Sequence, residues 1–301
     1  MTRRQALKAI SAVMAMLTPL GAIAVEQREV IKKSIPASSE LLPVIGLGTS
    51  RTFDVDLDPA LKQALKKLLE AFFQSGGALI DSSPMYGNAE QVTGELLKSL
   101  GNPSSVFAAT KVWINGREDG VEQMTRSFQR MNVEVMDLMQ IHNLRDWSVH
   151  LKTLRDWKER GKIRYIGVTT SHGRDHQALE ALLKKEPFDF VQLSYNLIDR
   201  EAEKRLLPIA QDKGIAVLAN RPFQRGDLFR LAKGRELPVW AAELGCSSWG
   251  QLFLKYVVSH PAVTCAIPAT NKLHHLVDNM GAGLGVLPND QQRQQIQALY
   301  A

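Results

Sequence analysis

Eight short apolar runs, each separated from the next by a longer segment of helical spacing, fill the sequence from residue 44 onward. The runs occupy residues 44–48, 78–80, 106–110, 135–141, 163–168, 188–193, 215–219 and 263–267. Short apolar runs that alternate with amphipathic helices are typical of parallel strands joined by helical crossovers. Eight such units in one chain predict a fold of the α/β class, the (β/α)8 or TIM barrel.

The segments between the runs have the apolar spacing of amphipathic helices, and several of them end in glycine. The clearest patterns cover residues 59–76, 121–132, 149–161, 176–186, 201–214 and 247–261. Gly76, Gly161 and Gly214 close three of them, as expected where a helix ends in a left-handed residue. We expect residues 25–42 to form a β-hairpin that plugs the barrel floor, and residues 288–299 to form an extra C-terminal helix.

A doubly wound open sheet is the structural alternative to the barrel. Such a sheet normally carries G-x-G-x-x-G directly after its first strand when it binds a dinucleotide. Here Gly46 and Gly48 are present, but Arg51 stands where the third glycine belongs. The sequence therefore favours a single barrel domain over residues 25–301.

The first 24 residues have the pattern of a signal peptide. A basic start with Arg3 and Arg4 precedes an apolar run over residues 9–17. Ala22 and Ala24 provide the small residues that signal peptidase accepts. Because the apolar run is too short to span a membrane comfortably, we expect cleavage near Ala24 and no stable membrane insertion afterwards.

The paired arginines resemble a twin-arginine (Tat) export signal, with Leu7 and Lys8 following them. That route carries proteins that are already folded, so a protein that acquires a cofactor in the cytoplasm has a reason to use it. We therefore expect the twin-arginine export machinery as a partner. The mature chain is expected in the periplasm, or otherwise exported from a bacterial cell, as a monomer.

Composition excludes several other classes of protein. With 45% hydrophobic and 23% charged residues, the chain is neither disordered nor fibrous. The net charge falls from +6 to +3 without Arg3, Arg4 and Lys8, and the remaining cations alternate with acids. This pattern indicates solvated helix faces, and we expect no nucleic-acid partner. Cys246 and Cys265 form either one bridge or two small core residues, and we expect no metal site.

A polar residue stands directly after, or within a few residues of, the end of each of the eight predicted strands. These residues are Thr49, Asp81, Lys111, His142, Thr169 with Thr170, Gln192, Asn220 and Thr270. Barrel enzymes work at the carboxyl ends of their strands, where loops from all eight strands meet. The set includes an acid, a lysine and a histidine, so it predicts a polar active site at that end.

Asp81, Tyr86, Lys111 and His142 form the most informative group. Lys111 leaves an apolar strand and needs an anionic partner there, which Asp81 on the neighbouring strand supplies. The Lys111 ammonium is expected to lower the pKa of Tyr86 from about 10, making the phenol a general acid nearer neutrality. His142 is expected to orient a carbonyl oxygen. Such a group protonates an oxygen and lacks a nucleophile, so hydride from a nicotinamide is its natural complement.

Several motifs together resemble the aldo/keto reductases over residues 41 to about 280. They are LPVIGLGTS, LIDSSPMYGNAE, ATKVW, DLMQIHN, GKIRYIGVTT, FVQLSYN and IPATNKLHHLVDN. The resemblance implies a (β/α)8 barrel that reduces aldehydes and ketones with NADPH. It also implies a catalytic tetrad of Asp81, Tyr86, Lys111 and His142, with Tyr86 as the proton donor.

The resemblance further implies the cofactor contacts. The family holds the nicotinamide carboxamide with a Ser-Asn pair and a Gln; here the pair is Thr169-Thr170, and Gln192 matches. The remaining expected contacts are Thr49, Asp81, His142, Asn220, Arg221, Pro222, Phe223, Gly226, Leu228, Ile267, Thr270, Lys272 and Asn279. Arg221 or Arg225 is the candidate for the pyrophosphate.

Cofactor choice depends on the loop after Ile267, where this chain departs from its relatives. Ala269 replaces a common Lys or Gly, and His275 replaces a common Arg. Lys272 is the fixed cation left to pair with a 2′-phosphate. NADPH is the expected cofactor, and NADH is not excluded.

Three aromatic residues follow strand ends and are expected to line the substrate pocket: Phe53, Trp113 and Trp147. They predict an apolar carbonyl substrate of small size. Two other classes of function stay open. One is an exported nicotinamide-binding sensor with little turnover; the other is a lyase or isomerase that uses Lys111 as a Schiff base.

The paired arginines make the export prediction testable. Replacing both, Arg3→Lys with Arg4→Lys, keeps the charge but should retain the precursor in the cytoplasm, because the twin-arginine pathway requires the guanidinium pair. Cell fractionation with immunoblotting measures the distribution of precursor and mature chain. Normal export of the double variant would contradict the assignment.

Overall fold

The strands that the apolar runs predict are present in the computed structural model, which describes residues 29–55 and 58–300. They are β3 (Leu47–Gly48), β4 (Leu79–Asp81), β5 (Phe107–Val112), β6 (Met136–His142), β7 (Ile163–Thr169), β8 (Phe190–Ser194), β9 (Ala216–Asn220) and β10 (Val263–Ala266). Each strand pairs in parallel with the next along the chain. The predicted signal peptide lies outside the described residues.

Backbone hydrogen bonds between the first and last strands close the sheet into a barrel. Gly46 N donates to Ala266 O at 2.8 Å, and Gly48 N donates to Pro268 O at 3.0 Å. A Cβ atom on Gly48 would lie 2.9 Å from Ile267 O, so glycine permits this close approach. The closure confirms the barrel and excludes the open sheet, whose edge strands would stay unpaired.

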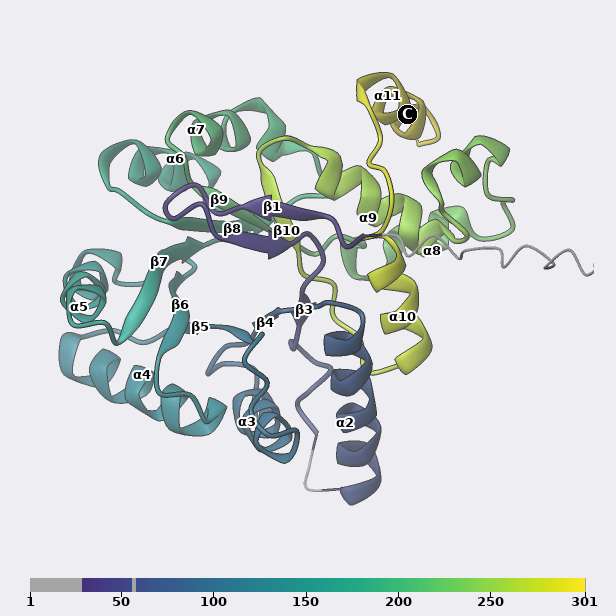
Figure 1. Cartoon of the computed structure of the whole chain (residues 1–301). Coiled ribbons are helices and arrows are strands. Elements are labelled where there is room, and N and C mark those ends of the chain that lie inside the picture. The colour runs from purple at the N-terminus through teal and green to yellow at the C-terminus, as the bar shows by residue number, and fades with distance from the viewer. Residues whose placement is uncertain (1–28, 56–57, 301) are drawn as a thin grey trace, which may run out of the picture.

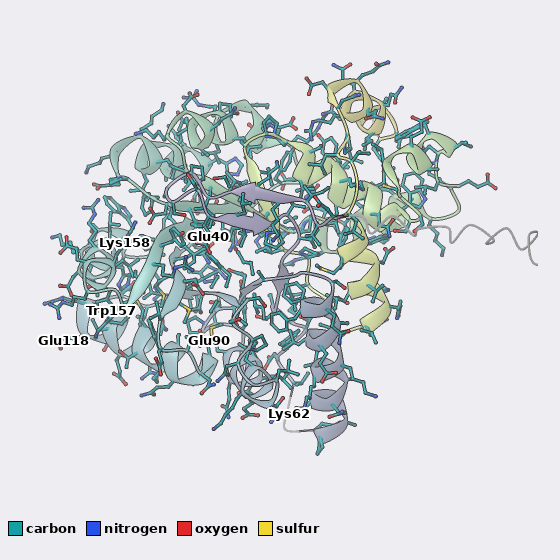
Figure 2. All side chains as sticks on the ribbon, viewed as in Figure 1. Glu40, Lys62, Glu90, Glu118, Trp157 and Lys158 are labelled. Carbon is teal, nitrogen blue, oxygen red and sulfur yellow. The ribbon has the colours of Figure 1, made fainter. Side chains whose placement is uncertain are left out.

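Helices surround the barrel on the outside (Figure 1). They are α2 (Pro59–Gln74), α3 (Ala89–Ser99), α4 (Arg117–Met131), α5 (Trp147–Glu159), α6 (His176–Lys185), α7 (Leu206–Asp212), α9 (Trp249–Ser259) and α10 (Leu273–Gly281). Glu118 of α4 projects from this ring, whereas Lys62 of α2 forms an ion pair with Glu95 of the neighbouring helix α3 (Figure 2). Within the described residues, no helix is long and apolar enough to cross a membrane.

Glycine ends three helices as predicted, but one predicted helix is wrong. Gly76, Gly161 and Gly214 have φ values of 78°, 68° and 65°. The single helix predicted over residues 201–214 is instead a short 3-10 turn, Glu201–Lys204, followed by α7. Pro208 explains the break, because a proline ring clashes with the carbonyl four residues earlier. Restarting the helix at Leu206 places Pro208 in a first turn, where proline is tolerated.

Two apolar cores lie on either side of the strands. The outer core fills the space between strands and helices. The inner core fills the barrel and includes Phe107, Tyr165 and Phe190, whose rings contact one another at 5.4–6.0 Å. Cys265 belongs to the inner core and Cys246 to the outer core, and both are free thiols. The possible bridge between them is therefore absent.

The predicted N-terminal hairpin is confirmed as β1 (Lys32–Ser34) paired with β2 (Leu41–Pro43), which crosses the barrel beside β10 (Figure 1). Ile35 and Leu42 are fully buried and extend the inner core from its amino-terminal end. Lys33 Nζ donates to Val263 O at 2.7 Å. The hairpin therefore plugs the floor, leaving only the carboxyl ends of the strands for a site.

Among the described residues, two further α-helices lie outside the eight units: α8 (Asp227–Ala232) and the predicted terminal helix, α11 (Asp290–Ala298). A capping box between Asn289 and Gln292 starts α11. Arg293 Nη1 donates to Ser259 Oγ at 2.6 Å, and its guanidinium lies 4.5 Å from the centroid of the Tyr256 ring. These contacts hold α11 against α9.

The floor plug predicts a large difference between two neighbouring substitutions. Ile35→Ala removes a fully buried side chain and should lower the free energy of unfolding by about 2–5 kcal/mol. Leu41→Ala, at a position that is 61% exposed, should lower it by less than about 1 kcal/mol. Urea denaturation followed by circular dichroism measures both. Equal losses would show that the hairpin does not seal the inner core.

Candidate active site

The parallel register brings the predicted polar residues together at the carboxyl end of the barrel. Lys111 of β5 is in register with Gln140 of β6. His142 of β6 is in register with Thr169 of β7, which is in register with Gln192 of β8. Because neighbouring parallel strands end at the same level, side chains distant in sequence meet at one mouth.

A buried ion pair lies at the centre of the mouth. Lys111 Nζ is 2.7 Å from Asp81 Oδ2 and also donates to Ser82 O at 2.6 Å. Lys111 is fully buried and Asp81 nearly so. Burial alone would lower the pKa of Lys111, but Asp81 and Tyr86 outweigh it and raise that pKa above the usual value. Lys111 is therefore a fixed cation, with the anionic partner that the sequence predicted.

Gln140 is a polar residue of the mouth that the sequence analysis missed. Its Nε2 donates to Asp81 Oδ1 at 2.9 Å, as does Gln192 Nε2 at the same distance. A Cβ atom on Gly167 would lie 2.8 Å from Gln140 Cγ, so this glycine makes room for the amide. The sequence feature that could have identified Gln140 is its position inside an apolar run. A polar side chain that is buried in a strand needs hydrogen-bond partners, so it indicates a polar site nearby.

Hydrogen bonds between the strand ends order the rest of the mouth. Thr49 Oγ1 donates to Ser82 Oγ at 2.9 Å. Ser194 Oγ donates to Asn220 Oδ1 at 2.8 Å, and Asn220 Nδ2 donates to Thr170 O at 3.0 Å. These bonds link strands on both sides of the mouth, so the site is organised before any ligand binds.

The turn after β4 carries Tyr86 back over the mouth. Tyr86 N donates to Ser83 O at 3.0 Å, which tightens the turn. Gly87 has a φ of 58°, and a Cβ atom there would overlap Asp54 at 2.2 Å. Lys111 Nζ lies 5.0 Å from the centroid of the Tyr86 ring. The phenol and the ammonium are thus adjacent, as the spacing predicted.

The predicted direction of the Tyr86 pKa shift is wrong. Burial raises the pKa of Tyr86, and this effect outweighs the lowering by Lys111; Asp81 raises it further. A phenolate would lose its hydration in this partly enclosed position. Tyr86 therefore stays protonated at neutral pH in the free protein.

His142 faces Tyr86 as a neutral imidazole. Their ring centroids are 6.1 Å apart at an interplanar angle of 87°. Burial, together with the Lys111 charge, lowers the pKa of His142 to about 3. Ser83 Oγ lies 3.2 Å from His142 Nδ1. A neutral imidazole has one N–H that donates and one nitrogen that accepts. It can therefore donate a hydrogen bond to a carbonyl oxygen without giving up a proton.

Two of the residues expected to contact the cofactor have a buried polar atom that is free to bind a ligand. Thr170 Oγ1 is buried without a hydrogen-bond partner, and so is Arg221 Nε. Buried polar atoms are normally paired, so both are suited to ligand contacts. Thr169 Oγ1 accepts from Asn143 N at 3.3 Å.

The loop after β9 and the start of α10 hold the other expected cofactor contacts. Pro222, Leu228 and Ile267 are buried. Phe223 contacts Phe229 with the two rings tilted at 50° and their centroids 4.8 Å apart, and Gly226 has a φ of 94°. Thr270 and Asn279 are buried, whereas Lys272 is exposed and its N–H donates to Thr270 Oγ1.

Burial and its neighbours His274 and Lys272 lower the pKa of His275, although Asp278 opposes them. His275 therefore adds no fixed positive charge beside Lys272.

The structure brings one of the three expected substrate-pocket aromatics to the candidate catalytic residues. The Trp113 ring centroid lies 6.3 Å from that of His142. Phe53 is fully buried in the outer core. Trp147 packs under Lys185 of α6, 5.5 Å from its Nζ. Phe53 offers no surface to a substrate in this state, and Trp147 faces the helix ring.

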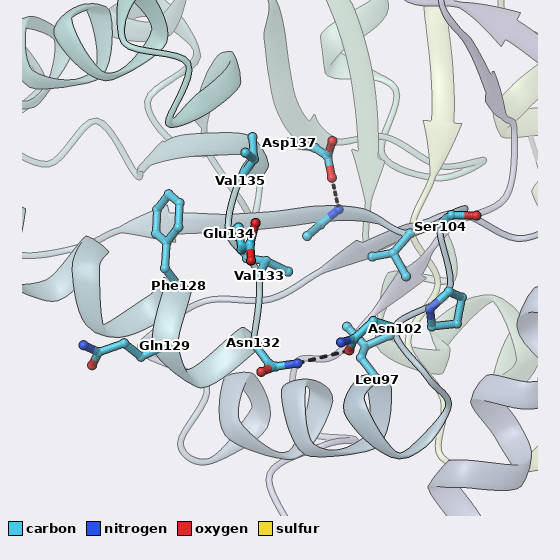
Figure 3. Close-up of a pocket in the computed structure, with 13 residues that line it drawn as sticks. Leu97, Asn102, Ser104, Phe128, Gln129, Asn132, Val133, Glu134, Val135 and Asp137 are labelled. Carbon is cyan, nitrogen blue, oxygen red and sulfur yellow. Dashed lines mark hydrogen bonds between the residues drawn. The ribbon is translucent and has the colours of Figure 1, made fainter.

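A groove of about 600 Å³ lies at the opposite end of the barrel (Figure 3). It is bordered by the ends of α3 and α4 and by the starts of β5 and β6, including Ala108 and Asp137. Asp137 Oδ2 accepts from Ala108 N at 2.7 Å there. Because barrel enzymes work at the other end, this groove is not the candidate active site.

Comparison with known proteins now identifies the family. The model of the aldo/keto reductase family matches residues 44–301. The methylglyoxal reductase YeaE of Escherichia coli (strain K12) is 29% identical over 257 residues, which cover 82% of this chain and 88% of that protein. A solved aldo/keto reductase of Klebsiella pneumoniae in complex with NADP and acetate superposes with a TM-score of 0.74 at 26% identity, covering 90% of this chain and 96% of that one.

The chain belongs to the aldo/keto reductase family and is an NAD(P)H-dependent oxidoreductase. A second relative, the NADH-specific methylglyoxal reductase of Escherichia coli (strain K12), is 28% identical over 64% of this chain and 68% of its own length.

The buried ion pair predicts a non-additive effect on stability. Asp81→Ala leaves the Lys111 ammonium buried and uncompensated, which should cost about 3–5 kcal/mol in the free energy of unfolding. Adding Lys111→Met removes the charge, so the double variant should recover a large part of that loss. Denaturant unfolding of the two single variants and the double variant measures the coupling. Strictly additive losses would contradict a direct ion pair.

Proposed function

We propose that this protein reduces an aldehyde or ketone to an alcohol with NADPH, and that Tyr86 is the proton donor. The observation that carries the proposal is the fixed Lys111–Asp81 pair beside a protonated Tyr86 and a neutral His142. Family membership and the NADP complex of the Klebsiella pneumoniae relative support it. The two methylglyoxal reductases among the relatives point to small carbonyl compounds as first substrates to assay.

Each side chain has a distinct part in the reaction. Tyr86 holds a proton at its phenol oxygen until the carbonyl oxygen gains negative charge. Lys111 then stabilises the phenolate that remains, and its attraction grows as the charge develops. Asp81 keeps Lys111 charged and in place, while His142 donates a hydrogen bond that orients the carbonyl oxygen.

Side chains at the mouth are assigned to separate parts of the cofactor. Thr170 and Gln192 are assigned to the nicotinamide carboxamide, and Arg221 to the pyrophosphate. When bound, the reduced nicotinamide supplies the hydride that the carbonyl carbon accepts. Thr270 and Lys272 are assigned to the 2′-phosphate, which favours NADPH over NADH.

The Schiff-base alternative is disfavoured by the state of Lys111. A Schiff base needs a neutral, accessible amine. Lys111 is fully buried, bound to Asp81, and has a raised pKa. Its ammonium is therefore held as a charge rather than released as a nucleophile.

We also propose that the mature protein works outside the cytoplasm after cleavage near Ala24. Arg3 and Arg4 before the apolar run support this location. The twin-arginine route exports proteins that are already folded. The hydrogen-bonded mouth could therefore take up the cofactor in the cytoplasm before export. A wild-type protein that binds NADPH but turns over no carbonyl compound would favour the sensor alternative instead.

Tyr86→Phe should lower the rate of carbonyl reduction by about 10²- to 10⁴-fold, because it removes the proton donor and keeps the ring. NADPH affinity, measured by fluorescence titration, should change little. The control is Tyr300→Phe, which makes the same change at a ring that packs against Trp249 and Phe253 and not against the candidate catalytic residues. Undiminished turnover with methylglyoxal or a similar aldehyde by the Tyr86 variant would remove this residue from the mechanism.

A further inference from the structure

A half-buried arginine, Arg145, lies beside the pocket aromatic that reaches the candidate catalytic residues. The Arg145 guanidinium carbon is 4.9 Å from the centroid of the Trp113 ring. The Trp113 and His142 ring centroids are in turn 6.3 Å apart. The backbone joins Arg145 to the same place, because Arg145 N donates to His142 O at 3.2 Å. Arg145 therefore adds a cation to the mouth on the side of Trp113.

Two neighbouring loops hold this arginine between them. Arg145 belongs to the loop that follows β6, and its Nε donates to Asn115 Oδ1, in the loop that follows β5, at 2.9 Å. In the opposite direction, Gly116 N donates to Asp146 Oδ2 at 2.8 Å. The guanidinium also stacks on Trp113, a contact that arginine makes well because its charge is spread over a plane. The side chain is therefore held by contacts to neutral groups of the other loop.

Both loops are themselves fixed by contacts with the helices below them. Trp113 N donates to Gln123 Oε1 of α4 at 2.6 Å, and His150 Nε2 of α5 donates to Ile114 O at 2.7 Å. In the second loop Leu144 has a φ of 58°. A non-glycine residue keeps such a strained backbone only where its surroundings hold it there, as they often do at ligand clamps. Arg145 is thus in position before any ligand binds.

The charge of Arg145 is not compensated by the protein. Among the residues that the structure describes, no carboxylate forms an ion pair with Arg145, and no acceptor binds its two terminal nitrogens. Arg164 is the opposite case: its side chain is 42% exposed, yet it pairs with both Glu40 and Asp137. A half-buried cation that is held by neutral partners at the edge of an active site is suited to an anionic group of a ligand.

We propose that Arg145 and Trp113 select a carbonyl substrate that carries a carboxylate at a distance from its aldehyde or ketone group. Because Nε is bound to Asn115, the two terminal nitrogens remain, and their parallel N–H groups match the two oxygens of a carboxylate. The ring of Trp113 contacts the part of the substrate between its carboxylate and its carbonyl group, which lies at Tyr86 and His142. This inference rests on the proposed function and narrows its substrate class to oxo acids.

Two aldehydes that differ only in charge test this selection: 4-carboxybenzaldehyde and its methyl ester. Arg145→Gln should lower the ratio of kcat/KM for the acid to kcat/KM for the ester by about tenfold, mainly through a higher KM for the acid. Arg145→Lys keeps the charge and should restore part of the ratio. The control is Arg160→Gln at the end of α5, which removes the same charge from an exposed position. An unchanged ratio in Arg145→Gln, or an equal fall in the control, would overturn the proposal.

A binding measurement separates this inference from the proposed function. Isothermal titration calorimetry with 4-(hydroxymethyl)benzoate, without cofactor, requires no turnover. Its affinity should fall about tenfold in Arg145→Gln and stay the same in Arg160→Gln, while thermal midpoints confirm that both variants fold. Binding that depends on Arg145 in a protein that reduces neither aldehyde would contradict the proposed function alone. Reduction of both aldehydes, with a carboxylate affinity that does not depend on Arg145, would overturn the inference alone.

Discussion

The buried ion pair between Lys111 and Asp81 is the interaction on which the mouth of this barrel depends. An ammonium at full burial is tolerated because Asp81 Oδ2 lies 2.7 Å away and Ser82 O accepts a second hydrogen bond. The other carboxylate oxygen accepts from Gln140 and Gln192, which ties four strands to one anion. The same ammonium faces Tyr86 and helps keep His142 neutral. A single buried charge therefore organises the strand ends and sets the protonation states of its neighbours.

The two ends of the barrel have opposite characters. Ile35 and Leu42 of the hairpin close the amino-terminal end and continue the apolar inner core. Above that core lies a layer of buried polar side chains. This order, from apolar floor to polar layer, leaves the carboxyl ends of the strands as the place for a polar ligand.

Most of the fold and the centre of the site were predictable because they depend on local patterns. Apolar runs and helical spacing located all eight strands, and glycine located three helix ends. The strand ends then indicated Asp81, Lys111 and His142. Two predictions were wrong, one about a helix and one about a pKa, and in each case a second physical effect outweighed the one considered. Pro208 interrupted a helix that spacing alone predicted. Burial outweighed the lysine charge at Tyr86, so the direction of its pKa shift was wrong.

The sequence by itself determined the alternation of strands and helices, the identity of the polar strand ends and the membership of a family, because each of these is carried by residue type and spacing. Only the tertiary structure decided which side chains share a contact. Gln140 reaches Asp81 because Gly167 leaves room on the neighbouring strand. Phe53 is fully buried in the outer core and does not line the mouth as predicted. Gly46 pairs with Ala266 because the sheet closes between its first and last strands. Packing and closure are properties of the whole chain, so no local pattern could have shown them.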